Sequence, residues 1–264
     1  MDNVIKMPNQ VGPWSGEIVY QDNRFVGLLL DVLSLLTMAD EYTGDGYPEE
    51  VHERHRKLLW RAAMWESMNL FECAGSLCYD NLDKDRQSYV LEKCHPTEKI
   101  AAFVRNYFQK SLDDKHPAYI EATSLILFRN TLAHPRAIDH RFAHVKLDPD
   151  GKSIIIKRFE DGVFNRSYHV SKRFEHVPVC SIPVSPLLWG RQDIIKVLNT
   201  MGDFLRYSLR DTAGMNGTEV YKLLGDTFEC QNTGSQRGNN TFCVPILEAE
   251  QRGVTLDFMI PESW

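Results

Sequence analysis

The chain has few cysteines and none of the paired arrangements that give cysteines a structural role. Its 264 residues include six cysteines and no CxxC pair, so neither a disulfide framework nor a thiolate zinc site is indicated. We expect inert thiols at these scattered positions (Cys73, Cys78, Cys94, Cys180, Cys230 and Cys243). Such usage is typical of a protein from a reducing compartment.

Long apolar segments are absent as well. The longest apolar run, Val26 to Leu36, is interrupted by Asp31 and Ser34 and is far too short to span a bilayer. The first ten residues, MDNVIKMPNQ, contain no apolar signal core. We therefore expect a cytoplasmic protein that makes no use of a membrane.

The common local signatures of catalysis are also missing. No HExxH motif occurs, and the stretches GMNG and GSQRG lack both the lysine and the strand–turn–helix context of a phosphate-binding loop. With 43% apolar and 25% charged residues, the composition is that of an ordinary globular protein. We expect no cofactor and no bound metal.

Positive charge is scarce overall but concentrated in one region. The formal net charge is −6, which argues against a broad surface for nucleic acid. Between Arg129 and His176, however, ten Lys/Arg stand against six Asp/Glu, and five of the nine histidines lie there. A local basic region on an acidic protein indicates a phosphate-bearing ligand, although a solvated surface of mixed charge explains the same counts.

The apolar spacing predicts a bundle of helices. Apolar residues recur every three or four positions in five segments, which is the period of an amphipathic helix. Pro48 and Pro117 stand at two of the predicted helix starts, where a missing N–H costs nothing. The predicted helices cover residues 19–42, 48–79, 97–112, 117–134 and 186–210.

A different pattern follows His134. β-Branched and aromatic residues are enriched at 144–147, 153–159, 164–170 and 176–182, with glycine turns DPDG and EDG between the first three segments, which predicts an antiparallel meander. We expect a mainly α, up-and-down helical bundle with this small β-meander inserted, α+β overall. The bundle spans 18–212 with the insert at about 143–182. Residues 213–264 form an appendage, with a short helix at 218–228 and a hairpin of FCVPILEA with VTLDFMI.

The stretch from Phe128 to Pro135 is the strongest candidate for chemistry. Arg129, Asn130 and His134 stand close together where the fourth predicted helix ends before proline. Histidine can take a proton from a ribose 2′-OH, and arginine can hold two phosphate oxygens and stabilise the extra charge of a pentacoordinate phosphorus. The amide of Asn130 can orient either group. By spacing alone, a structural helix cap explains the pattern as well.

RNTLAH followed by proline resembles the Arg-x(4–6)-His signature of HEPN domains, in which a polar residue commonly follows the arginine and alanine commonly precedes the histidine. The resemblance covers the motif and the helical order of about 20–135 and 187–210. It implies a metal-independent endoribonuclease that leaves a 2′,3′-cyclic phosphate, typically a toxin or phage-defence effector. It assigns catalysis to Arg129, Asn130 and His134, in a composite active site across a homodimer, with RNA as substrate and an antitoxin or other defence protein as a possible partner.

Three alternatives stay open at this stage. The family also contains members without catalysis that serve as binding or dimerisation modules. His134, His140 and His144, with Asp139 near them, form H-x5-H-x3-H, which leaves a metal site open.

The third alternative is a separate RNA-recognition module built on the strands 143–182. There, aromatic side chains that could stack on bases alternate with cations that could hold the backbone, although aromatics buried under a small sheet would give the same pattern. The aromatic residues are Phe159, Phe164, Tyr168 and Phe174, and the cations are Lys157, Arg158, Arg166, Lys172 and Arg173. The wider set of RNA-binding candidates is Arg136, His140, Arg141, His144, Lys172 and Arg173.

Overall fold

The computed structural model of the protein describes the helical body of the chain and several short strands. The described residues are 18–21, 24–44, 46–133, 143–147, 153–158, 182, 189–225, 227–230, 235–238 and 243–261. The helices are α1 (Arg24–Asp40), α2 (Glu49–Asp80), α3 (Tyr89–Glu92), α4 (Pro96–Phe108), α5 (Pro117–Ala133), α6 (Arg191–Leu205), a π-helix (Arg206–Thr212), α7 (Gly217–Leu224), α8 (Cys243–Gln251) and a 3₁₀ turn (Asp257–Met259). The five helices expected from the apolar spacing are therefore present.

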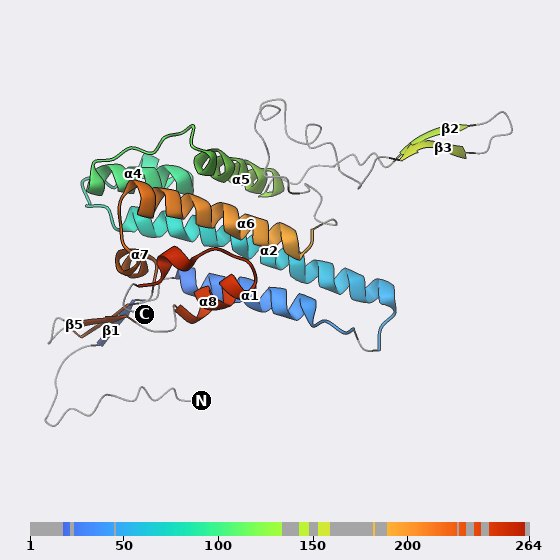
Figure 1. The fold of residues 1–264 in the computed structure, drawn as a ribbon, viewed down its shortest axis with the longest axis horizontal. Coiled ribbons are helices and arrows are strands. Elements are labelled where there is room, and N and C mark those ends of the chain that lie inside the picture. The colour runs from blue at the N-terminus through green and yellow to red at the C-terminus, as the bar shows by residue number, and fades with distance from the viewer. Residues whose placement is uncertain are drawn as a thin grey trace, which may run out of the picture.

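Helix α2 is the central element of the bundle. It contacts α1 along much of its length and also packs against α4 and α6, as Figure 1 shows. Its start follows from the sequence, because Pro48 precedes it and Glu49 and Glu50 lie in the first turn, where carboxylates complement the helix dipole. The buried face of α2 begins at Ala63 and includes Met64, Leu70 and Ala74. The apolar stripes of several helices therefore meet in one core.

Helices α5 and α6 run antiparallel, and this arrangement positions both ends of α5. Near its C-terminal end, Phe128 packs edge-to-face on Trp189, with the ring centroids 6.0 Å apart. At its N-terminal end, the ring of His116 stacks flat on Tyr207, with centroids 3.8 Å apart. The predicted fifth helix thus corresponds to α6 together with the π-helix that follows it. Tyr207 lies in the π-helix.

The C-terminal residues correct the predicted terminal hairpin. Cys243–Gln251 is helix α8, not a strand. Residues 254–258 do alternate between buried and exposed, with Val254, Leu256 and Phe258 buried. The backbone beside them, however, forms hydrogen bonds with the side chain of Asn199. Asn199 Nδ2 donates to the Gly253 carbonyl at 3.0 Å, and Asn199 Oδ1 accepts from the Thr255 N–H at 2.9 Å. The prediction was wrong because alternation shows an extended segment, not its pairing partner.

The predicted α+β fold class with an inserted β-meander was also wrong, because the described structure is mainly α. Within 143–182 the described strands form a two-stranded hairpin, β2 (Ala143–Leu147) with β3 (Ser153–Arg158). The strands predicted at 164–170 and 176–182 lie outside the described residues, apart from Ile182. A separate antiparallel sheet has the order β1 (Ile18–Gln21), β4 (Thr227–Cys230), β5 (Ser235–Gly238). Enrichment in β-branched residues therefore located two strands but did not determine the fold class.

Within the described part of the chain, we find no helix that combines the length and the apolar character needed to cross a membrane.

Candidate functional site at the end of helix α5

Arg129 and Asn130 lie at the C-terminal end of α5 with partly exposed side chains. Arg129 Nη1 donates a hydrogen bond to Asn130 Oδ1 at 3.1 Å. Neighbouring positions on a helix point in directions about 100° apart, so this bond holds the two polar groups together at one edge of the helix. Two of the three residues singled out in the sequence are therefore brought into contact.

A carboxylate from a distant part of the sequence completes this cluster. Glu72 on α2 lies with its Oε1 3.5 Å from Arg129 Nη2. Glu66, six residues earlier on the same helix, instead accepts a hydrogen bond from Asn69 on α2 at 3.2 Å. In the sequence, Glu66 and Glu72 both lie inside an apolar run, so the pattern alone does not show which of them pairs with a cation. Only the packing of α5 on the bundle distinguishes them.

Phe128 anchors the end of α5 that carries the cluster. Its side chain is 1% exposed and belongs to the hydrophobic core, and its ring meets Trp189, just before α6. Because Arg129 follows directly in the chain, burial of Phe128 fixes the direction in which the guanidinium leaves the helix. The polar cluster thus rests on a rigid apolar support.

Most of the other candidates cannot be placed. His134, Arg136, His140, Arg141, Lys172 and Arg173 lie outside the described residues. So do Asp139 and the proposed base-stacking or cationic residues Phe159, Phe164, Arg166, Tyr168 and Phe174. His144 is in β2, where the backbone register places it opposite Lys157 of β3, beside an irregularity in the pairing.

The donors of Arg129 are shared between Asn130 and Glu72 in this cluster. A guanidinium offers several N–H donors, and Arg129 uses part of this capacity on Asn130 and Glu72. A phosphodiester could replace Glu72 as the anion against Arg129, because both side chains of this pair are about one third exposed (35% and 29%). Glu72 would then act as the resting counterion of Arg129.

Among the described residues, no three His, Cys, Asp or Glu side chains come close enough together to hold a metal ion. Of the thiols, Cys78 and Cys94 are free. Burial raises the pKa of the fully buried Cys78 thiol far above its usual value, so Cys78 is not a thiolate near neutral pH. This agrees with the inert role expected for it. Cys180 lies outside the described residues.

Glu72→Gln is expected to change the free energy of unfolding by less than about 1 kcal/mol, since partly exposed ion pairs contribute little. Urea unfolding of the wild type, Glu72→Gln, Arg129→Gln and the double variant measures the coupling between the two side chains. Glu66→Gln is the matched control, because it removes the same charge from the same helix away from Arg129. A coupling above about 2 kcal/mol would contradict the expectation, since only buried pairs reach that size.

No protein-family model, no curated protein and no solved structure matches this chain. The likeness of RNTLAH to the HEPN signature therefore rests on those residues and on the helical bundle that carries them.

Proposed function

We propose that this chain is a metal-independent endoribonuclease of the HEPN type. The observation that carries the proposal is the contact between Arg129 and Asn130 at the partly exposed end of α5, four residues before His134 in the sequence. A helical bundle that presents an arginine and an amide together at the end of a core-anchored helix suits a phosphodiester substrate. Phosphate geometry matches the planar donors of arginine.

In this proposal the neutral imidazole of His134 removes the proton from a ribose 2′-OH. The 2′-oxygen attacks phosphorus, the bond from phosphorus to the 5′-oxygen breaks, and the products are a 2′,3′-cyclic phosphate and a free 5′-OH. Arg129 neutralises the charge that develops on the phosphoryl oxygens, and Asn130 orients the guanidinium through their hydrogen bond. No step needs a metal ion.

The reaction needs an acid as well as a base, and one chain supplies one motif histidine. A homodimer with a composite site provides the second group, because a two-fold axis duplicates every residue near it. The proposed substrate is cytoplasmic RNA, and the proposed role is that of a toxin or phage-defence effector. The basic candidates between Arg136 and Arg173 would guide RNA towards the site, and an antitoxin or other defence protein would restrain it.

Arg129→Ala and His134→Ala are each expected to reduce RNA cleavage by at least about 100-fold, the usual contribution of a proton-transferring or charge-stabilising group. The measurement is cleavage of a labelled RNA in the presence of EDTA, with identification of the 3′ end. Arg54→Ala is the matched control, because Arg54 is an exposed cation on α2 and its loss should leave cleavage intact. Activity that disappears in EDTA would instead support the histidine-rich metal alternative.

A specific observation favours a second candidate function. Arg129 already has an anionic partner in Glu72, so the arginine can serve simply to join α5 to α2. In that case the chain is a non-catalytic HEPN-like module that binds nucleic acid or another protein. Two results together would favour this function over the nuclease: wild-type protein that leaves RNA uncut, and a strong energetic coupling between Glu72 and Arg129.

A further inference from the structure

The exposed side of α2 carries a tryptophan close to the Arg129 cluster. Trp65 is 37% exposed, whereas the other two tryptophans that the structure describes belong to the interior: Trp189 is 2% exposed and Trp60 packs against the core. An indole buries a large apolar surface when it enters a core, and Trp65 leaves part of that surface in water. Exposed tryptophans are enriched where proteins bind their partners.

Trp65 lies on the same side of α2 as the partner of Arg129. It precedes Glu72 by seven residues, so the two side chains leave the helix within about 20° of each other and about 10 Å apart along its axis. The carboxylate of Glu72 contacts Arg129 of α5. In the view of Figure 1, α5 and α2 run in opposite directions, so the chain that follows Arg129 proceeds along α2 from Glu72 towards Trp65. Trp65 therefore borders the candidate site.

A cation continues this side of α2 beyond Trp65. Arg61 stands four residues before Trp65, and side chains at this spacing are neighbours on a helix. Its Nε donates to a backbone carbonyl of its own helix at 3.4 Å, and its guanidinium forms no ion pair with any residue that the structure describes. Glu66, the acid next to Trp65, is turned by about 100° from it. An aromatic ring and an uncompensated cation thus stand side by side.

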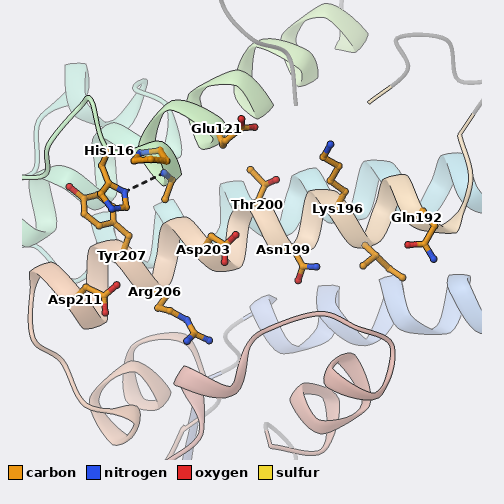
Figure 2. A pocket seen from close by; sticks show the side chains of 13 residues that line it. His116, Glu121, Gln192, Lys196, Asn199, Thr200, Asp203, Arg206, Tyr207 and Asp211 are labelled. Carbon is orange, nitrogen blue, oxygen red and sulfur yellow. Dashed lines mark hydrogen bonds between the residues drawn. The ribbon is translucent and has the colours of Figure 1, made fainter. Parts of the chain in front are cut away.

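The ring of Trp65 is not occupied by a neighbouring ring. In the part of the chain that the structure describes, it has no contact with another aromatic side chain or with a cation. At the far end of α5, by contrast, the ring of Tyr207 is covered by His116, as Figure 2 shows, and Tyr107 on α4 packs against Phe103. A ring that already packs on a neighbour offers less surface to a nucleobase. Trp65 keeps its surface available.

We propose that Trp65 stacks on a base of the bound RNA next to the phosphate held by Arg129, and that Arg61 contacts a phosphate further along the same strand. This inference rests on the proposed function, whose site it extends by these two residues. The bases of unpaired RNA stack on aromatic side chains while neighbouring cations hold the backbone. Every base has a π face, so little preference among the four bases is expected.

The test measures the binding of a labelled 2′-O-methyl hexauridylate to the full chain by fluorescence anisotropy. The methyl group blocks attack by the 2′-oxygen, so the strand stays intact and binding is measured whether or not the protein cuts RNA. Trp65→Leu keeps an apolar side chain without a π face and should weaken binding by about tenfold, and Trp65→Phe should restore most of the affinity. Tyr89→Ala is the matched control, because Tyr89 is a 74% exposed aromatic residue on α3, and it should bind like the wild type.

An abasic strand of the same length separates stacking from charge. Wild type and Trp65→Leu should bind this strand equally, since it has no base to stack. Arg61→Gln should weaken the binding of both strands and lower the slope of log K against log salt by about 0.7, the value for one phosphate of a single strand. Three results would each overturn the proposal: no binding of hexauridylate by the wild type, wild-type affinity in Trp65→Leu, or the same loss on the abasic strand.

Two further outcomes keep this inference distinct from its rivals. If Trp65→Leu binds hexauridylate like the wild type but changes the oligomeric state in sedimentation, Trp65 contacts a second copy of the chain and the stacking role is wrong. If binding depends on Trp65 and on the bases while unmodified RNA stays uncut, the stacking role is supported and the nuclease proposal fails. The chain would then be the nucleic-acid-binding module described above.

Discussion

Phe128→Ala is expected to lower the free energy of unfolding by about 3–5 kcal/mol, the cost of removing a fully buried aromatic ring. The ring is 1% exposed and contacts Trp189, so its removal leaves a cavity between the end of α5 and the start of α6. Helix α6 cannot move freely to fill this cavity, because it also packs against α2. Chemical denaturation monitored by circular dichroism measures the loss.

Two variants test whether the ring itself is responsible for this effect. Phe128→Leu keeps most of the apolar volume and is expected to cost less than about 1.5 kcal/mol. Ile120→Ala removes apolar atoms from the same helix at a position that is 37% exposed, and it should cost much less than the loss of the ring. If Phe128→Ala were no more destabilising than Ile120→Ala, the end of α5 would not be anchored as described. The support for Arg129 would then be lost as well.

Gly75→Ala is expected to destabilise the protein by about 3 kcal/mol, although alanine is the better helix former by about 1 kcal/mol. A Cβ at position 75 would lie 2.6 Å from the Cα of Pro96 and 2.7 Å from its Cβ. These atoms belong to the first residue of α4, so no flexible side chain can move aside. Helices α2 and α4 would have to separate.

Gly27→Ala adds the same methyl group but is expected to raise the stability of the protein. Gly27 is in the interior of α1, and a Cβ there meets no atom within 4 Å. This variant is therefore expected to gain up to about 1 kcal/mol. Thermal and urea unfolding of both variants should give shifts of opposite sign. A stabilising effect of Gly75→Ala would mean that α4 does not approach α2 this closely.

The helices could be predicted from the sequence because their information is local. Leu29, Leu33 and Leu36 repeat at helical spacing and are buried in the core, and Pro117 is the first residue of α5, as its missing N–H suggests. The β predictions were less successful because strands require partners. Val254 and Leu256 alternate with exposed residues, as residues of a strand do. Their segment nevertheless packs against α6 at Gly202, where a Cβ on residue 202 would lie only 2.9 Å from the Thr255 carbonyl oxygen.

The sequence by itself determined the order of the helices, the position of Arg129 and Asn130 at the end of one of them, and the apolar stripes that bury α1 and α2. These depend on a period of 3.6 residues and on capping chemistry. Only the tertiary structure decided that Glu72 pairs with Arg129, that Gly75 meets Pro96, and that His116 stacks on Tyr207. Each of these joins residues that are distant in the chain, and their distance in space is set by how whole helices pack together.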